Sequence, residues 1–173
     1  MWSALTRLFV RKPAFKPGPP SAPQLLFTDS CVAALQECLL PEIQKRHEGI
    51  AYLAGRTDGG VTIAIAAMRP KAQTTPGSFN VTAAAMAPIV RAAASRGLQV
   101  VGQVHTHPRE AFHSGGDEEG ARIAYTGYVS LVLPDYGGHL PGFDGAAVYL
   151  FRAGLGFVQV EPARFRIIPG RLL

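Results

Sequence analysis

The stretch from Val104 to Gly120, "VHTHPREAFHSGGDEEG", gathers side chains of the kinds that bind metals and move protons. It contains three of the chain's five histidines and includes three consecutive acids. His105 and His107 lie near the end of "LQVVGQVHTH", an apolar run typical of a buried strand. Because successive side chains of a strand point to opposite faces, both imidazoles should lie on one face of a sheet.

A carboxylate completes this candidate metal site. Pro108 should end the strand, and Ser114 stands three residues before Asp117 at the head of the predicted helical stretch "DEEGARIAY". A helix N-terminus favours the ionised form of Asp117. Two imidazoles and one carboxylate leave a fourth position for water, as in catalytic zinc sites. The set of His105, His107 and Asp117 therefore predicts one catalytic Zn²⁺ per chain.

Peptide hydrolysis at such a centre also requires a proton carrier. Zinc lowers the pKa of its water and polarises a carbonyl, but a base must take up the proton and pass it to the leaving amine. Glu48 is the candidate, since it stands at the start of the strand predicted for "GIAYLAG" and has no basic residue four positions on.

Each of these residues also has an ordinary structural explanation. Ser114 and Asp117 alone would form a common helix-capping pair, His105 and His107 alone could be core histidines, and Glu48 alone could be a solvated loop acid. All three explanations would have to hold at once, which favours the functional interpretation. His113, in contrast, is interpreted as a solvent-facing loop histidine rather than as a cleft residue.

The segments "HTHP" and "SGGD", with the glutamate of "EGIAYLAG", resemble the motif of the JAMM metalloproteases. These are the catalytic branch of the MPN domains (Mov34/PAD-1-like, or JAB, domains). The resemblance implies that His105, His107 and Asp117 bind zinc and that Glu48 is the general acid/base. It also implies that Ser114 stabilises the oxyanion of the tetrahedral intermediate, a donor role typically worth about 3 kcal/mol.

The same resemblance implies a peptidase or isopeptidase acting after the C-terminal glycine of a ubiquitin-like protein. The expected partners are that protein or its conjugates and the activating and conjugating enzymes of its pathway. Five residues separate Pro108 from Ser114, where familiar eukaryotic members have six. Only "PDYGGHLPGFDG" stands where those members carry a long ubiquitin-gripping insertion. These departures favour a compact bacterial member, with C-terminal processing of a β-grasp sulfur-carrier protein and a non-catalytic MPN scaffold as alternatives.

The elements that must position these residues follow from the apolar periodicity. The sequence predicts a helix from Asp29 that Pro41 ends or kinks, and a hairpin of "GIAYLAG" and "VTIAIAAM". A second helix is predicted between Thr82 and Arg96. Further strands are predicted over Leu98–His107, Tyr128–Leu133, Ala146–Arg152 and Phe157–Val160. This order predicts a layered α/β domain, and the resemblance implies a mixed, mostly antiparallel curved sheet flanked by helices, with a cytidine-deaminase-like architecture.

Length and composition suit one such domain. The chain has 173 residues, of which 47% are hydrophobic, and a net charge of +5. Four basic residues precede the first acid, so the basic excess belongs to the N-terminus, and no nucleic-acid partner is expected. The proline-rich stretch "KPGPPSAPQ" divides a tail, residues 1–24, from the domain, residues 25–173. The tail is interpreted as a disordered basic segment, with contact to a partner or membrane surface as the alternative.

The cellular compartment is inferred from cysteines and apolar runs. Cys31 and Cys38 are seven residues apart on a predicted helix, about 10 Å along one face, which argues against a disulfide between them. The segment "MWSALTRLFVRK" has no uninterrupted apolar run of the length expected for a signal peptide, and nowhere do 18 apolar residues occur together. A cytoplasmic protein is therefore expected.

Overall fold

A computed structural model describes residues 24–160 and 164–169. The predicted tail lies outside these residues except for Gln24, with which the first strand begins. The helices are α1 (Asp29–Lys45), α2 (Ala83–Ala94) and α3 (Gly115–Gly120), with a short 3-10 turn, η1 (Asp135–Gly137). The strands are β1 (Gln24–Thr28), β2 (Ile50–Asp58), β3 (Val61–Met68), β4 (Ala72–Thr75), β5 (Ser78–Val81), β6 (Gln99–Thr106), β7 (Val129–Leu133), β8 (Ala147–Arg152), β9 (Gly156–Gln159) and β10 (Arg164–Ile168).

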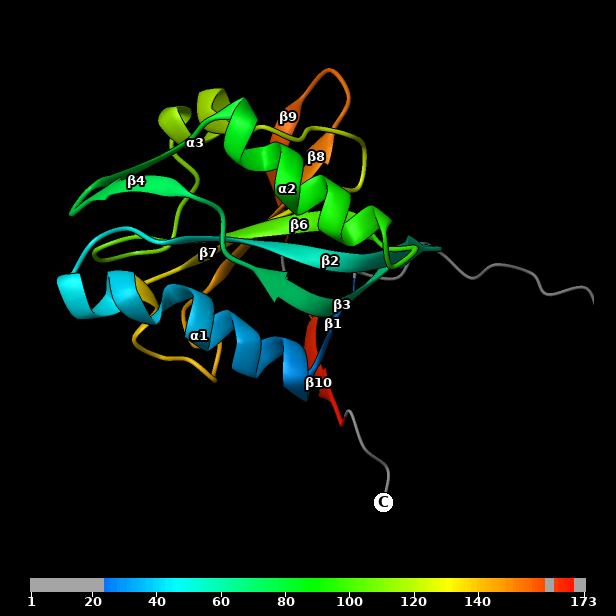
Figure 1. Cartoon of the computed structure of the whole chain (residues 1–173), viewed down its shortest axis with the longest axis horizontal. Coiled ribbons are helices and arrows are strands. Elements are labelled where there is room, and N and C mark those ends of the chain that lie inside the picture. Colours follow the sequence, from blue (N-terminus) through cyan, green and yellow to red (C-terminus); the bar gives the residue numbers. More distant parts are fainter. Residues whose placement is uncertain (1–23, 161–163, 170–173) are drawn as a thin grey trace, which may run out of the picture.

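Eight strands form one curved sheet in the order β10-β1-β3-β2-β6-β7-β8-β9 (Figure 1). β2 pairs antiparallel with β3 and β6, and β8 pairs antiparallel with β7 and β9. β1 is parallel to both β10 and β3, and β6 is parallel to β7. β4 and β5 form a separate antiparallel hairpin. The expected mixed, mostly antiparallel sheet in an α/β domain is thus confirmed.

The two long helices cover opposite faces of this sheet. Leu35 and Leu39 of α1 pack in one apolar cluster with Val104 of β6. Met86 and Ile89 of α2 pack in a second cluster that includes residues of β2. Each helix begins with a threonine whose hydroxyl accepts a backbone N–H of the first turn. The central strands β2, β6 and β7 are therefore mostly buried on both sides.

A bulge in β6 decides which face carries the histidines. Leu53 pairs with Gly102 and Ala54 pairs with Val100, so Val101 is an extra residue in the ladder. Val101 and Val104 consequently both pack on the α1 side, although they are an odd number of residues apart. Since one residue of register reverses the face of every side chain that follows, this bulge directs His105 and His107 away from α1.

One predicted element boundary is wrong, whereas α1 continues past Pro41, which was expected to end or kink it. In the last turn of α1, the buried Glu42 accepts hydrogen bonds from Arg69 on both carboxylate oxygens, at 2.8 and 2.9 Å. The predicted helical stretch through Tyr125 is only the six-residue α3, because the chain turns extended at Ala121, directly after Gly120. A glycine at the end of so short a helix supplies little helix propensity to extend it.

Two smaller expectations can be compared with the described part of the chain. Cys31 and Cys38 are both free thiols, as predicted. None of the helices described here combines the length and hydrophobicity needed to cross a membrane.

Candidate metal centre and active site

The side chains of His105, in β6, and His107, directly after β6, point into the same interior space. His105 is fully buried and His107 is nearly so. Their ring centroids are 5.3 Å apart. Past the strand, His107 donates its backbone N–H to the Leu133 carbonyl and accepts the N–H of Tyr136. These bonds fix the main chain on both sides of the second imidazole.

Asp117 reaches the histidines from the start of α3. Its Oδ2 lies 3.4 Å from Nε2 of His105 and 3.4 Å from Nε2 of His107. Ser114 caps the helix: its hydroxyl and its backbone N–H both donate to Asp117 Oδ2 at 2.7 Å, and its Oγ accepts the Asp117 N–H at 3.2 Å. The ordinary capping role of Ser114 is therefore present, and it also orients the carboxylate toward the imidazoles.

The three residues suit a divalent metal ion. One ligand atom from each of His105, His107 and Asp117 lies within 4.8 Å of the others, and all three residues are buried. Nε2 of each histidine is buried without a hydrogen-bond partner, and the same holds for Nδ1 of His105. Buried polar atoms are nearly always satisfied, so the two unpartnered Nε2 atoms, each 3.4 Å from Asp117 Oδ2, indicate a ligand that would satisfy them.

The surroundings of the site lower the pKa values of two of its ionisable groups, for different reasons. Burial lowers the pKa of His105, which favours the neutral imidazole that a metal requires. Burial opposes ionisation of Asp117, yet its contacts with His105, His107 and Ser114 hold its pKa well below the ordinary value. The protein therefore offers the neutral imidazole of His105 and the ionised carboxylate of Asp117 at the same point.

Glu48 lies two residues before Ile50 of β2, on the same face of the sheet as the imidazoles. Only 5% of its surface is exposed. Burial raises its pKa to about 7, while nearby His107 lowers it and Asp117 raises it. Its backbone N–H donates to the Thr75 carbonyl of β4 at 2.8 Å. The structure thus brings Glu48 to the site as a carboxyl group able to bind and release a proton near neutral pH.

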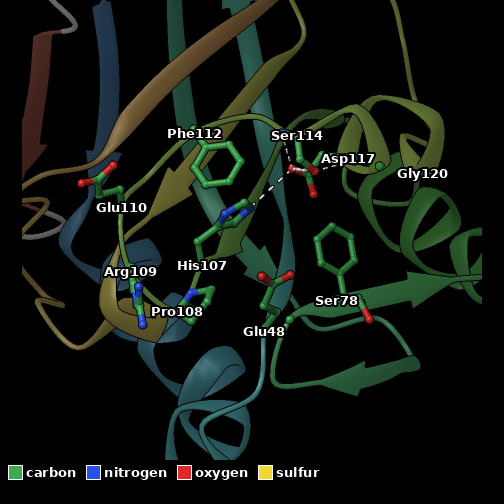
Figure 2. A pocket seen from close by; sticks show the side chains of 13 residues that line it. Glu48, Ser78, His107, Pro108, Arg109, Glu110, Phe112, Ser114, Asp117 and Gly120 are labelled. Atoms are coloured by element: carbon green, nitrogen blue, oxygen red, sulfur yellow. Dashed lines mark hydrogen bonds and ion pairs between the residues drawn. The ribbon is translucent and has the colours of Figure 1, made fainter.

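Glu48, His107, Ser114 and Asp117 line one cleft of about 510 Å³. Figure 2 shows the Glu48 carboxyl and the His107 ring pointing into it, with Ser114 and Asp117 beyond them. All five predicted site residues are gathered here, since His105 lies directly behind the cleft wall with its ring next to His107.

The cleft has a wall that the sequence patterns did not indicate. Gly77, Ser78 and Phe79, at the turn and on β5, line it opposite Phe112 and the loop that follows β6. Phe79 lies 5.3 Å from the His105 ring, and the Phe112 ring meets His107 edge-on at 4.6 Å. The dipeptide Pro76–Gly77 is a turn signal that could have identified this hairpin.

The interpretation of His113 as a solvent-facing loop residue is wrong. Its ring stacks on Phe157 at 4.5 Å and lies 5.1 Å from that of Tyr149, and its Nε2 is buried. Burial, with a smaller effect of His105, lowers its pKa to about 4. The aromatic residues of β8 and β9 cover this side chain, a tertiary contact that the local sequence does not encode.

The fold and the site together define an α/β domain with a buried His–His–Asp group that could hold a metal ion. Residues 35–139 match the family model for prokaryotic homologs of the JAB domain. A curated relative from Sinorhizobium fredii, described as the probable metalloprotease y4jG, is 30% identical over 137 residues, 77% of this chain and 85% of its own. The solution structure of protein DSY2949 from Desulfitobacterium hafniense superposes with a TM-score of 0.60 at 18% identity, covering 85% of this chain and 96% of that one.

The chain belongs to the prokaryotic JAB domain family. The resemblance to the JAMM/MPN proteins is thereby confirmed, and the likeness to DSY2949 supports the fold alone. Together with the buried His–His–Asp group, the family and the relative indicate a metalloprotease.

Proposed function

We propose that this protein is a zinc-dependent peptidase or isopeptidase that hydrolyses the bond after the C-terminal glycine of a ubiquitin-like protein, in a bacterial ubiquitin-like pathway. The observation that carries the proposal is the shared cleft, into which His107 and Asp117 of the His–His–Asp set and the protonatable Glu48 all open. Hydrolysis of an unactivated amide needs both parts at one place.

Zinc is the metal that two histidines and one carboxylate with an open position best accommodate, and when bound it activates water and polarises the scissile carbonyl. The chain supplies the proton transfers. Glu48 accepts a proton as the carbonyl is attacked and returns it to the leaving amine. Ser114 acts on the developing oxyanion, and for this its hydroxyl must rotate away from Asp117 Oδ2, to which it donates at 2.7 Å.

The substrate class is proposed from the walls of the cleft. β5 pairs only with β4 in the described part of the chain, so its outer edge can receive an extended peptide through main-chain hydrogen bonds. Phe79 and Phe112 flank the route to His107. An extended tail that ends in glycine presents backbone to both the strand edge and the ligands without a side chain to clash with these rings.

The decisive test compares E48Q with the wild-type protein, both loaded with Zn²⁺. Because Glu48 is not one of the metal ligands, E48Q should keep its metal. Its turnover should fall by about 100-fold or more, the range typical of a lost general base. Linear fusions of ubiquitin and of bacterial β-grasp sulfur-carrier proteins serve as substrates, with cleavage followed by mass spectrometry. Near-normal cleavage by E48Q would remove Glu48 from the mechanism.

The glycine requirement is tested on whichever fusion is cleaved. Replacing its last glycine by leucine should abolish cleavage, because the larger side chain must enter between the two phenyl rings. Equal cleavage of the glycine and leucine versions of this fusion would refute the inference that Phe79 and Phe112 leave no room for a side chain. Cleavage confined to sulfur-carrier fusions would assign the protein to carrier maturation instead of deconjugation.

A further inference from the structure

Thr106 stands between the two histidine ligands in the sequence, yet its side chain lies on the other face of the sheet. Only 1% of its surface is exposed. Its methyl group faces Gly137 of η1, where an added Cβ would come within 3.2 Å of it. Thr106 is therefore not among the residues that line the cleft, and packing alone would not require a hydroxyl there.

The hydroxyl has a specific partner across the sheet. Oγ1 of Thr106 accepts the backbone N–H of Gly49 at 2.8 Å, and the N–H of Thr106 donates to the Gly49 carbonyl at 3.1 Å. Gly49 is thus held by both of its backbone polar groups to one residue of β6. Thr106 Oγ1 thus takes the place of a backbone carbonyl as the acceptor of the Gly49 N–H, one residue before β2 begins.

Gly49 itself has little freedom to move toward α1. A Cβ at this position would lie 2.9 Å from Leu39 Cδ2 and 3.3 Å from Glu42 Cβ. On its other side, the preceding residue Glu48 donates its N–H to Thr75 of β4. The main chain of Glu48 and Gly49 is therefore clamped between β6, the hairpin and α1.

We propose that Thr106 is a positioning residue, whose hydroxyl holds the main chain of Gly49 and thereby sets the position of the Glu48 carboxyl relative to His105 and His107. One strand then fixes both halves of the site: alternate side chains present the ligands on one face, and the intervening hydroxyl holds the proton carrier from the other. This inference rests on the proposed peptidase function for its kinetic consequence, but not for its structural one.

The test uses T106V, which replaces the hydroxyl by a methyl group of similar shape and leaves the buried Gly49 N–H without an acceptor. T106S keeps the hydroxyl and removes the methyl group. T62V is the matched control, because Thr62 is a buried threonine at the far end of β3, whose hydroxyl lies 3.0 Å from that of Thr57. All variants are examined as full chains loaded with Zn²⁺.

Amide hydrogen exchange gives the readout that is independent of activity. In T106V the Gly49 and Glu48 amides should exchange at least tenfold faster than in the wild type, whereas T106S and T62V should stay within about threefold. Unchanged exchange at Gly49 in T106V would overturn the proposal, even if the wild type cleaves none of the fusions. A wild type that cleaves nothing would instead count against the peptidase function.

Kinetics on the cleaved fusion then test the link to Glu48. T106V should lower kcat at least tenfold with KM and zinc content unchanged, and T106S should retain at least half of kcat. In the E48Q background, T106V should lower kcat by less than twofold, because the effects of substitutions at residues that act through one another are not additive. Loss of zinc in T106V, equal losses in T106V and T106S, or full additivity with E48Q would each overturn the assignment.

Discussion

The surroundings of two carboxyl groups in the cleft shift their pKa values in opposite directions. Asp117 gains contacts with two imidazoles and a hydroxyl, and its pKa falls well below the ordinary value. Glu48 is buried with fewer compensating contacts, and its pKa rises to about 7. Such a divergence between neighbouring acids separates the group that stays charged from the group that transfers protons.

The raised pKa of Glu48 predicts a pH-dependent cost of stability in metal-free protein. The folded chain retains a proton that the unfolded chain releases between about pH 4.5 and 7, so the free energy of unfolding should fall as pH rises through this window. E48Q lacks this penalty. The free energy of unfolding of E48Q should match that of the wild type near pH 5 and exceed it by roughly 2–3 kcal/mol at pH 8, as measured by urea unfolding with a chelator.

The control for that experiment is E110Q, which neutralises an exposed acid of the same cleft. E110Q should show no such divergence from the wild type between the two pH values. A constant offset between E48Q and the wild type at pH 5 and pH 8 would mean that the folded protein does not hold the proton on Glu48.

The ligand set predicts which side chains the metal needs. H107A and D117A should each weaken zinc binding by more than the roughly 10- to 100-fold that loss of a supporting hydrogen bond causes, because each removes a donor itself. H139A is the matched control, since His139 is exposed and pairs with Asp135 at 3.0 Å. Elemental analysis after dialysis measures the difference, and stoichiometric zinc in either ligand variant would contradict the assignment.

At the residue scale, the positions of site residues could be predicted from the sequence where they depend on a local pattern. The alternation of His105 and His107 placed both imidazoles on one face, and the capping pattern brought Asp117 to them. The environment of His113 was not predictable, because its partners Tyr149 and Phe157 come from strands more than 30 residues away. Local pattern cannot distinguish a covered loop histidine from a solvated one.

At the element scale, β2 is where the chain approaches a neighbour most closely. A second register shift lies between Ala54 and Gly55 in its pairing with β3. A Cβ at Gly55 would overlap the Ile63 carbonyl oxygen. The strand that leads from Glu48 is therefore compatible only with glycine at this position.

G55A should accordingly destabilise the protein by more than about 2 kcal/mol, since the obstructing atom is backbone and cannot rotate away. G77A provides the comparison, because no atom lies within 4 Å of a Cβ built at Gly77. Its unfolding midpoint should stay close to that of the wild type. Equal midpoints for the two variants would show that β2 and β3 can separate at the bulge without cost.

Element boundaries were less predictable than element types. The long apolar strands and both long helices follow from periodicity, whereas the β4–β5 hairpin is short and polar and escaped it. Pro41 was expected to end or kink α1, yet the helix continues through it because Arg69 and the αL residue Arg46 stabilise the following turn. In both cases tertiary contacts outweigh the local preference.

At the scale of the whole molecule, the site should be independent of the N-terminal tail. Every site residue lies at or beyond Glu48, and the described sheet begins with Gln24. A protein that begins at Gln24 should therefore keep its zinc content and its turnover of peptide fusions. The measurement is metal analysis and kinetics beside the full chain. Loss of zinc or of folding would place the domain boundary before Gln24.

The parallel pairing of β1 with β10 also has a consequence for synthesis on the ribosome. Gln24 pairs with Arg164 and Thr28 with Ile168, so the outer neighbour of β1, the first described strand, is β10, the last described strand. While the chain is being made, β1 can join β3 but exposes its other edge to any extended segment nearby. The outer edge of β1 is thus unprotected until β10 has been synthesised, and the nascent chain is most prone to aggregate in that interval.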